Sequence, residues 1–111
     1  MDCVFCKIAN KDISAKIIYE DKNILAFPDI NPITPTHILV IPKKHISSIN
    51  DLGENDKELM GELFLAAQKI AKDKNVEKTG YRLIFNVGKD AGQSISHIHL
   101  HLLGGKKLLW E

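Results

Sequence analysis

Three of the five histidines in this 111-residue chain stand at alternate positions of one short stretch, HIHLHLL, residues 97–103. In a β-strand successive side chains point to opposite faces, so His97, His99 and His101 share one face and the aliphatic residues between them share the other. A single histidine on a strand is explained by partial exposure to water. Three imidazoles in register on one face instead predict a chemical role.

Such a row of histidines suggests either a zinc site or phosphoryl transfer. A strand rises about 3.3 Å per residue, which puts the outer two α-carbons about 13 Å apart, whereas a zinc–nitrogen bond is about 2.0 to 2.1 Å long. At most two of the three histidines could therefore bind the same ion. In phosphoryl transfer a neutral imidazole, with a pKa of about 6.5, attacks phosphorus, and water later breaks the phosphoimidazole bond. Neighbouring imidazoles and loop amides would stabilise the phosphoryl oxygens, and Ser94 could protonate the leaving group.

A second candidate group lies at the start of the chain, where CVFC contains Cys3 and Cys6. This spacing is typical of a metal-binding pair, of a redox pair and of two buried thiols, and by itself it leaves all three open. The first residues have neither the basic region nor the apolar region of a signal peptide, and no apolar run approaches the roughly 20 residues of a membrane span. We therefore expect a cytoplasmic protein, in which structural disulfides are rare.

The composition narrows the possible classes of protein. A chain of 111 residues with 44% hydrophobic and 26% charged side chains is typical of one soluble globular domain, here 1–111, with a core of its own. Fifteen basic and fourteen acidic residues give a net charge of +1. This balance argues against nucleic acid or a membrane surface as a partner.

One long helix and about five strands must position these groups. A helix is predicted from Asn55, an N-cap candidate with Glu58 three residues later, to about Lys74. Its apolar residues recur at intervals of three and four and form a face toward the core: Leu59, Met60, Leu63, Phe64, Ala67, Ile70 and Ala71. Apolar runs bounded by turn residues predict strands over 16–21, 23–29, 37–42, 81–88 and 97–105, and a short helix capped by Asp2 over 5–10. This order favours an α+β fold class, with a mostly antiparallel sheet of about five strands, the long helix between the third and fourth, and a short N-terminal helix.

Taken together, these stretches resemble the Hint branch of the histidine triad (HIT) nucleotide-binding family. The resemblance rests on HIHLHLL between AGQSIS and GG, on CVFCKI, AKIIYED, FPDINPITPTHILVIPKKHI and YRLIFNVG, and on Trp110, in the family's order along nearly the whole chain. It implies a HIT-like fold and an enzyme that hydrolyses purine nucleoside 5′-phosphoramidates to AMP or GMP. Two alternatives remain open: a dinucleoside polyphosphate hydrolase, as in the Fhit branch, and a nucleotide-binding or interaction module with residual activity.

The resemblance also implies roles for the histidines. His99 would attack the α-phosphorus and carry a nucleotidyl-histidine intermediate, while its other ring nitrogen donates to a nearby backbone carbonyl. His101 would bind the phosphate, and Ser94 would contact or protonate the leaving group. His37 would orient the triad from behind; a hydrogen-bonded histidine at the start of a strand is the other interpretation of this residue.

Nucleotide recognition is assigned by the same resemblance. Asp29 would accept hydrogen bonds from the ribose hydroxyls, and Ile30 would pack on the purine face. Without the resemblance, Asp29 is a turn former before Asn-Pro. Trp110 would reach the active site of a partner subunit. The residues implied to lie near the phosphate are Asn86, Gly92, Ser94, Ile95, His99 and His101.

The family likeness favours a metal clip as the explanation of CVFC. Some bacterial relatives with this cysteine pair bind zinc through four positions, which are Cys3, Cys6, His45 and His97 in this chain. Two thiolates and two imidazoles form a closed tetrahedral set, so the resemblance implies a structural zinc ion and no organic cofactor. The apolar helix face and the strand YRLIF offer more apolar surface than a small domain buries alone, and we expect a homodimer of the kind that the family forms.

Overall fold

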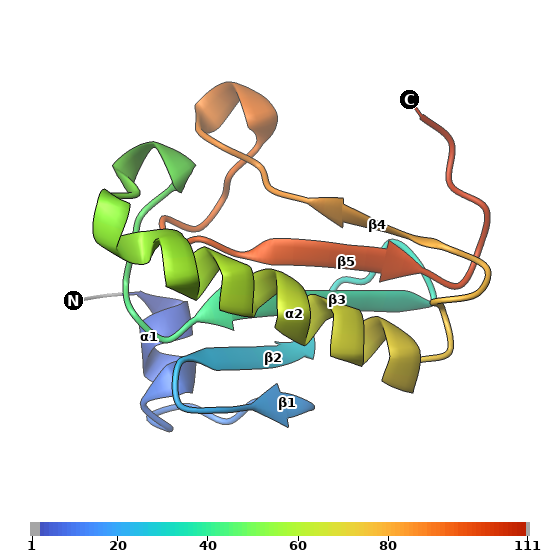
Figure 1. The fold of residues 1–111 in the computed structure, drawn as a ribbon, viewed down its shortest axis with the longest axis horizontal. Helices are drawn as coiled ribbons and strands as arrows, with labels where there is room; N and C mark the ends of the chain where they lie inside the picture. The colour runs from blue at the N-terminus through green and yellow to red at the C-terminus, as the bar shows by residue number, and fades with distance from the viewer. Residues whose placement is uncertain (1–2, 111) are drawn as a thin grey trace.

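The computed structural model describes residues 3–110. Its five strands form one antiparallel sheet in the order β1-β2-β3-β5-β4, so β4 is an edge strand although it precedes β5 in the chain. The main elements are α1 (Val4–Ala9), β1 (Tyr19–Glu20), β2 (Ile24–Pro28), β3 (Thr36–Pro42), α2 (Lys57–Asp73), β4 (Tyr81–Ile84) and β5 (Leu100–Gly104) (Figure 1). The predicted fold class is confirmed. Among the described residues, no helix is long and apolar enough to cross a membrane.

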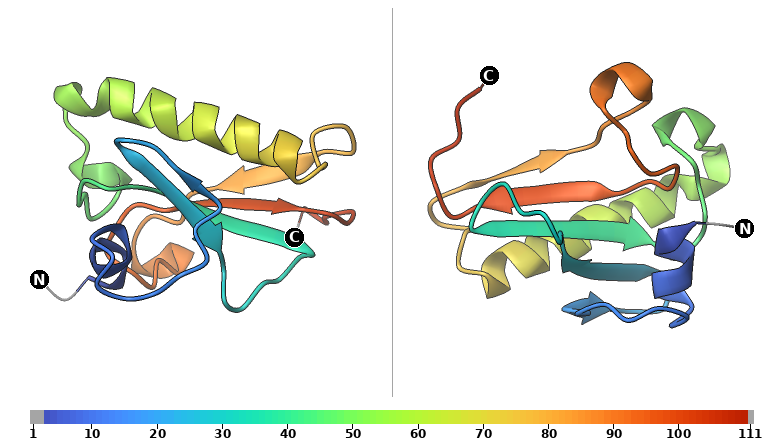
Figure 2. Two further views of the ribbon diagram at one scale, coloured as in Figure 1. Left: turned by 90° about the horizontal axis from the view of Figure 1, so that it is seen from below. Right: turned by 180° about the vertical axis from the view of Figure 1, so that it is seen from behind.

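The main core lies between α2 and one face of the sheet (Figure 2). On the helix, Leu63 and Ile70 are buried at a spacing of seven residues, and they pack with Ile24, Val40 and Leu100 from three neighbouring strands. Each of these strands contributes every second side chain to this face, as the alternation of a strand requires. This packing fixes β5, and with it the end of the histidine row, between β3 and the edge strand β4.

The start and the apolar face of α2 differ from the prediction. The N-cap is Asp56 rather than Asn55, and the short 3-10 helix η2 (Glu54–Asp56) precedes α2. The Asp56 carboxylate accepts hydrogen bonds from the Gly53 backbone N–H at 2.9 Å and from the Lys44 ammonium at 2.7 Å, so it stabilises the start of η2 and makes no side-chain cap bond to α2. Phe64, predicted to face the core, is 47% exposed, because it lies at the edge of the apolar stripe.

A second, smaller core covers the opposite face of the sheet, where α1 lies (Figure 2). Phe5 and Ile8 of α1 pack there with Leu25, Phe27 and Leu39, so β2 is buried on both faces. Cys3 caps this helix, since its Sγ accepts from the backbone N–H of Cys6 at 3.4 Å. The predicted cap residue at position 2 lies outside the described residues.

The histidine row is only partly in a regular strand. The predicted strand over 97–105 begins at Leu100, and the strand over 81–88 ends at Ile84. The backbone N–H of Ile98 bonds to the carbonyl of Ile46 at 2.8 Å instead of to a neighbouring strand. The alternation nevertheless continues through this stretch: Ile98, Leu100 and Leu102 are buried in the core beneath α2. The histidines between them therefore project to the face that carries α1.

Candidate active site and metal cluster

His99 is held in one orientation by a hydrogen bond to the backbone of His97. Its Nδ1 lies 2.8 Å from the carbonyl oxygen of His97, so Nδ1–H is the donor and Nε2 carries a free lone pair. The ring is buried, with Phe5 packed against it edge-on at 5.3 Å between centroids and His101 at 4.9 Å. The hydrogen bond to a backbone carbonyl that the resemblance implied is present. A fixed neutral imidazole with a free Nε2 is a competent nucleophile.

A chain of hydrogen bonds behind His99 fixes the tautomer of His101. The backbone N–H of Ile33 donates to Nδ1 of His37 at 3.2 Å, so the proton of the neutral His37 ring is on Nε2. That Nε2–H donates to Nδ1 of His101 at 3.0 Å, which leaves the His101 proton on Nε2. The Nε2 of His101 is buried and has no hydrogen-bond partner among the described residues. An unpartnered buried donor beside a nucleophile is suited to an anionic oxygen.

The surroundings of His37 and His101 keep both rings neutral. Burial, reinforced by the neighbouring His99 and His37 and opposed by Asp29, lowers the pKa of His101 to about 4. Burial also lowers the pKa of His37, again opposed by Asp29, whose Oδ2 lies 3.5 Å from Nε2 of His37. Asp29 is itself oriented by the backbone N–H of Asn31, which donates to its Oδ1 at 2.8 Å. At neutral pH these histidines therefore act as hydrogen-bond donors without carrying a charge.

The Asp29, His37 and His101 side chains also lie close enough for a shared cation, with their ligand atoms all within 4.8 Å. The tautomer of His37 argues against a metal there. Its Nδ1 accepts from Ile33, so its Nε2 is protonated and has no lone pair to offer a metal. This group is better described as a hydrogen-bond relay.

A cavity of about 600 Å³ opens in front of His99 and His101. Its apolar wall comes from α1 through Val4, Phe5 and Ile8. The predicted site residues that line it are Asp29, Ile30, Ser94, Ile95, His99 and His101. His37 stands behind His101, outside the lining. Ile30 is 92% exposed at the rim.

Three of the predicted nucleotide-binding residues do not line this cavity. Asn86 follows β4, and Gly92 lies in the loop that leads to Ser94, with a positive φ of 80° that favours glycine. Trp110 is 89% exposed, and the guanidinium of Arg82 lies 5.9 Å from the centre of its ring. Within the described part of one chain, Trp110 is therefore not brought to the histidines.

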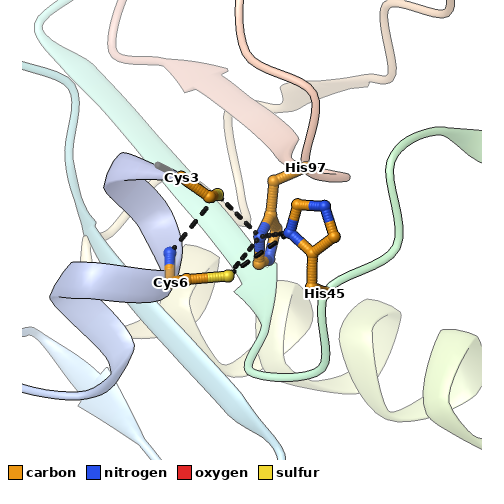
Figure 3. A group of neighbouring side chains, drawn as sticks. All are labelled: Cys3, Cys6, His45 and His97. Carbon is orange, nitrogen blue, oxygen red and sulfur yellow. Dashed lines mark hydrogen bonds between the residues drawn. The ribbon is translucent and has the colours of Figure 1, made fainter. Parts of the chain in front are cut away.

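The other predicted group, Cys3, Cys6, His45 and His97, converges at the start of α1 (Figure 3). Sγ of Cys3 lies 3.3 Å from Nδ1 of His97, and Sγ of Cys6 lies 3.3 Å from Nδ1 of His45. The two Nδ1 atoms are 3.2 Å apart, and all four donor atoms lie within 4.8 Å of one another.

These distances fit a tetrahedral metal ion. Ordinary zinc–nitrogen and zinc–sulfur bonds would put donor atoms about 3.3 to 3.8 Å apart. Nε2 of His97 donates to the carbonyl of Pro42 at 2.8 Å, so its Nδ1 lone pair faces the two sulfurs. Burial raises the pKa of the Cys6 thiol, as does its hydrogen bond with Cys3. A cation between the sulfurs would favour their ionised form. The four side chains can therefore hold a metal ion.

Two residues close to the site were missed by sequence reasoning. Phe5, between the two cysteines, packs edge-on against His97 at 5.8 Å between ring centroids and against His99 at 5.3 Å, so it links the Cys/His group to His99. The only sign of this role in the sequence was an aromatic residue between the two cysteines of CVFC. Gln93 makes three side-chain hydrogen bonds around the loop before the histidines. Its signal was only a long polar residue between Gly92 and Ser94.

Comparisons with known proteins identify the family to which this fold belongs. A family model described as "Scavenger mRNA decapping enzyme C-term binding" matches residues 2–108. The purine nucleoside phosphoramidase of Escherichia coli K12 is 41% identical over 107 residues, covering 96% of this chain and 90% of that protein. The crystal structure of a HIT family hydrolase from Legionella pneumophila superimposes with a TM-score of 0.96 at 52% identity, covering 98% of this chain and 97% of that one. A histidine triad protein from Clostridium difficile also gives a TM-score of 0.96, at 47% identity over all of this chain and 96% of that one. The chain therefore belongs to the histidine triad family, as does the HIT family hydrolase of Legionella pneumophila.

Proposed function

We propose that the protein hydrolyses purine nucleoside 5′-phosphoramidates and releases AMP or GMP. The observation that carries this proposal is the pairing of two ring nitrogens at one cavity: the free Nε2 lone pair of His99 and the unpartnered Nε2–H of His101. One is a nucleophile and the other is a donor for the phosphoryl oxygen on which charge develops. The similarity to the purine nucleoside phosphoramidase of Escherichia coli supports the choice of substrate class.

The reaction would proceed in two displacements at phosphorus. Nε2 of His99 attacks the α-phosphorus, the phosphorus–nitrogen bond of the substrate breaks, and the amine takes up a proton as it leaves. Ser94, which lines the cavity, is the proposed contact or proton donor for that amine. Water then attacks phosphorus, the bond to His99 breaks, and the mononucleotide departs. His101 donates to a non-bridging oxygen in both displacements because its Nε2–H is fixed by His37.

The nucleoside would occupy the remainder of the cavity. The Asp29 carboxylate stands at its wall with the relay behind it, and it can accept hydrogen bonds from the two ribose hydroxyls. The apolar side chains of Val4, Phe5 and Ile8 offer a surface for the purine ring, with Ile30 at the rim. A base held mainly by apolar contact accepts adenine and guanine alike, which supports both AMP and GMP as products.

Turnover of a substrate panel tests this function. We expect adenosine and guanosine 5′-phosphoramidates to be hydrolysed with a higher kcat/KM than diadenosine polyphosphates, and we expect His99→Ala to abolish turnover of both. A preference for diadenosine polyphosphates would instead identify a dinucleoside polyphosphate hydrolase. AMP binding without turnover of either class would identify a nucleotide-binding module. Either of these two results contradicts the proposal.

We also propose that Cys3, Cys6, His45 and His97 hold a structural zinc ion. The set is closed, with two sulfurs and two nitrogens and no open position for a substrate. In the reducing cytoplasm, where we propose that the protein acts, both cysteines remain available as ligands. Elemental analysis of protein purified without chelator should give about one zinc per chain. Metal-free protein under those conditions, or a turnover rate that requires added zinc, would contradict a structural site.

Finally, we propose a two-fold homodimer formed through α2 and the edge strand β4. Phe64 and Leu65 of α2 are 47% and 59% exposed, and Phe64 packs edge-on against Phe85, just after β4, at 6.0 Å. Covering these side chains needs a second surface of the same kind. Light scattering should give twice the chain mass of 12.5 kDa, and Phe64→Glu should shift the protein to monomer. A wild-type protein that is monomeric at micromolar concentration would refute the dimer.

A further inference from the structure

The loop before the histidine row is closed by one side chain, that of Gln93. The backbone N–H of Gly88 donates to Oε1 of Gln93 at 3.0 Å, and the backbone N–H of Gln93 donates to the carbonyl of Gly88 at 3.1 Å. The two residues are thus paired twice, once through the side chain and once through the backbone. This pairing closes the segment 88–93 into a ring around the short 3-10 helix η3 (Lys89–Ala91).

The amide nitrogen of Gln93 makes two further hydrogen bonds, and we call the three side-chain bonds of Gln93 the clamp. Its Nε2 donates to the carbonyl of Ser47 at 2.7 Å and to the carbonyl of Ile95 at 3.1 Å. The Ile95 carbonyl also accepts from the backbone N–H of His97 at 2.9 Å. Both donors and the acceptor of the amide are therefore used on the backbone, which leaves the side chain no donor for a substrate.

The loop has little else to hold it. Residues 88–92 are exposed or nearly so, and none of them contributes to either core. Gly88 and Gly92 both have positive φ, at 82° and 80°, and glycine loses more conformational freedom on ordering than other residues. Apart from the bonds of the Gln93 side chain, this segment is held by two backbone hydrogen bonds, from the Gly92 N–H to the Lys89 carbonyl and from the Gln93 N–H to the Gly88 carbonyl.

We propose that Gln93 is a positioning residue that preorganises this loop for the phosphoryl transfer at His99. The inference rests on the proposed function. Gln93 does not line the cavity, whereas the next two residues, Ser94 and Ile95, do. Holding the backbone on both sides of Ser94 fixes where its hydroxyl and the neighbouring amides meet the substrate. Preorganised donors of this kind lower the barrier to the chemical step because they need no rearrangement during the reaction.

Kinetics of two variants and one matched control test the clamp. Gln93→Ala removes all three contacts, and we expect kcat/KM to fall on the order of 10- to 100-fold, chiefly through kcat, as expected for small misplacements at a reacting centre. Asn75, exposed in the turn after α2 and outside the cavity lining, offers a matched amide-to-carboxylate change, and Asn75→Asp should keep wild-type kinetics. Thermal denaturation of each variant shows whether the folded fraction accounts for any loss.

Gln93→Glu supplies a signature that a general loss of stability would not. Its carboxylate still accepts from Gly88 but turns an oxygen toward the Ser47 and Ile95 carbonyls, where the amide donated. Protonation restores one donor, so the ratio of its kcat/KM to that of Asn75→Asp should rise as pH falls toward the carboxyl pKa of about 4.3. A ratio independent of pH, or wild-type kinetics in Gln93→Ala, would overturn the proposal.

Hydrogen exchange separates the clamp from the proposed function. In free protein, the Gly88 amide should exchange at least tenfold faster in Gln93→Ala than in wild type, because its acceptor is gone. If no nucleotide substrate is turned over, the proposed function fails, while faster Gly88 exchange still supports the clamp. Unchanged Gly88 exchange overturns the clamp whatever the enzyme hydrolyses.

Discussion

Because the pKa of His101 is low, we expect the stability of the folded protein to depend on pH. An ordinary histidine titrates at about 6.5, whereas burial, with His99 and His37 nearby, lowers the pKa of His101 to about 4. Between about pH 4 and 6.5, therefore, His101 is protonated in the unfolded chain and neutral in the folded chain. The free energy of unfolding therefore falls as pH drops from about 6.5 to about 4, and it changes no further from this residue below that.

The size of the effect follows from the same shift. A shift of about 2.5 pKa units corresponds to about 3 kcal/mol, at about 1.36 kcal/mol per unit. The ring of His101 is only partly buried, so screening by solvent should leave about 1 to 2 kcal/mol. Urea denaturation of wild type and of His101→Gln at several pH values between 7 and 4 should show a steeper loss of stability in wild type by this amount.

Imidazole resonances in NMR spectra give the direct check on this reasoning. The His101 ring should remain neutral, with its proton on Nε2, down to about pH 5, and should titrate near 4. A midpoint near 6.5, or identical pH slopes for wild type and His101→Gln, would refute the burial argument.

Three further predictions concern single side chains around the cavity. Phe5 is buried between Phe27 and the histidines. Phe5→Ala should therefore lower the free energy of unfolding by about 3 to 5 kcal/mol, and Phe5→Leu by less than about 1.5 kcal/mol. Equal urea midpoints for the two variants would contradict this. Asp29→Asn should reduce the preference for ribo- over 2′-deoxynucleotide substrates on the order of tenfold, since it weakens a charged hydrogen bond; an unchanged ratio of kcat/KM values would show that Asp29 does not contact the ribose. His37→Phe should lower kcat on the order of 10- to 100-fold with little change in KM, because it leaves Nδ1 of His101 without its donor; a change confined to KM would argue against the relay.

The alternation of the histidine row was enough to predict its two faces. Its aliphatic residues are buried beneath α2, and His99 and His101 meet one cavity on the other side. The strand period holds even though β5 begins only at Leu100, because side-chain alternation needs an extended backbone and not a paired one. The gathering of Cys3, Cys6, His45 and His97 came from the family resemblance, and the structure brings these residues together.

Contacts between distant segments could not be predicted from the sequence. The tautomer of His101 depends on the backbone N–H of Ile33, in a loop that residue patterns describe only as irregular. The role of Gln93 depends on the carbonyl of Ser47, 46 residues away. Asp56 is the residue before α2, in place of Asn55, because the 3-10 helix η2 takes up residues 54–56. Residue propensities indicate which residues can cap a helix, but the folded structure determines which of them does so.

The proposed covalent intermediate on His99 can be trapped directly. Wild-type protein mixed with excess adenosine 5′-phosphoramidate and quenched in base within one turnover should carry one adenylyl group, and peptide mass spectrometry should place it on His99. His99→Ala should carry none and should not turn over. Turnover by wild type without any adduct, an adduct on His101 or on another residue, or full activity in His99→Ala would contradict the account.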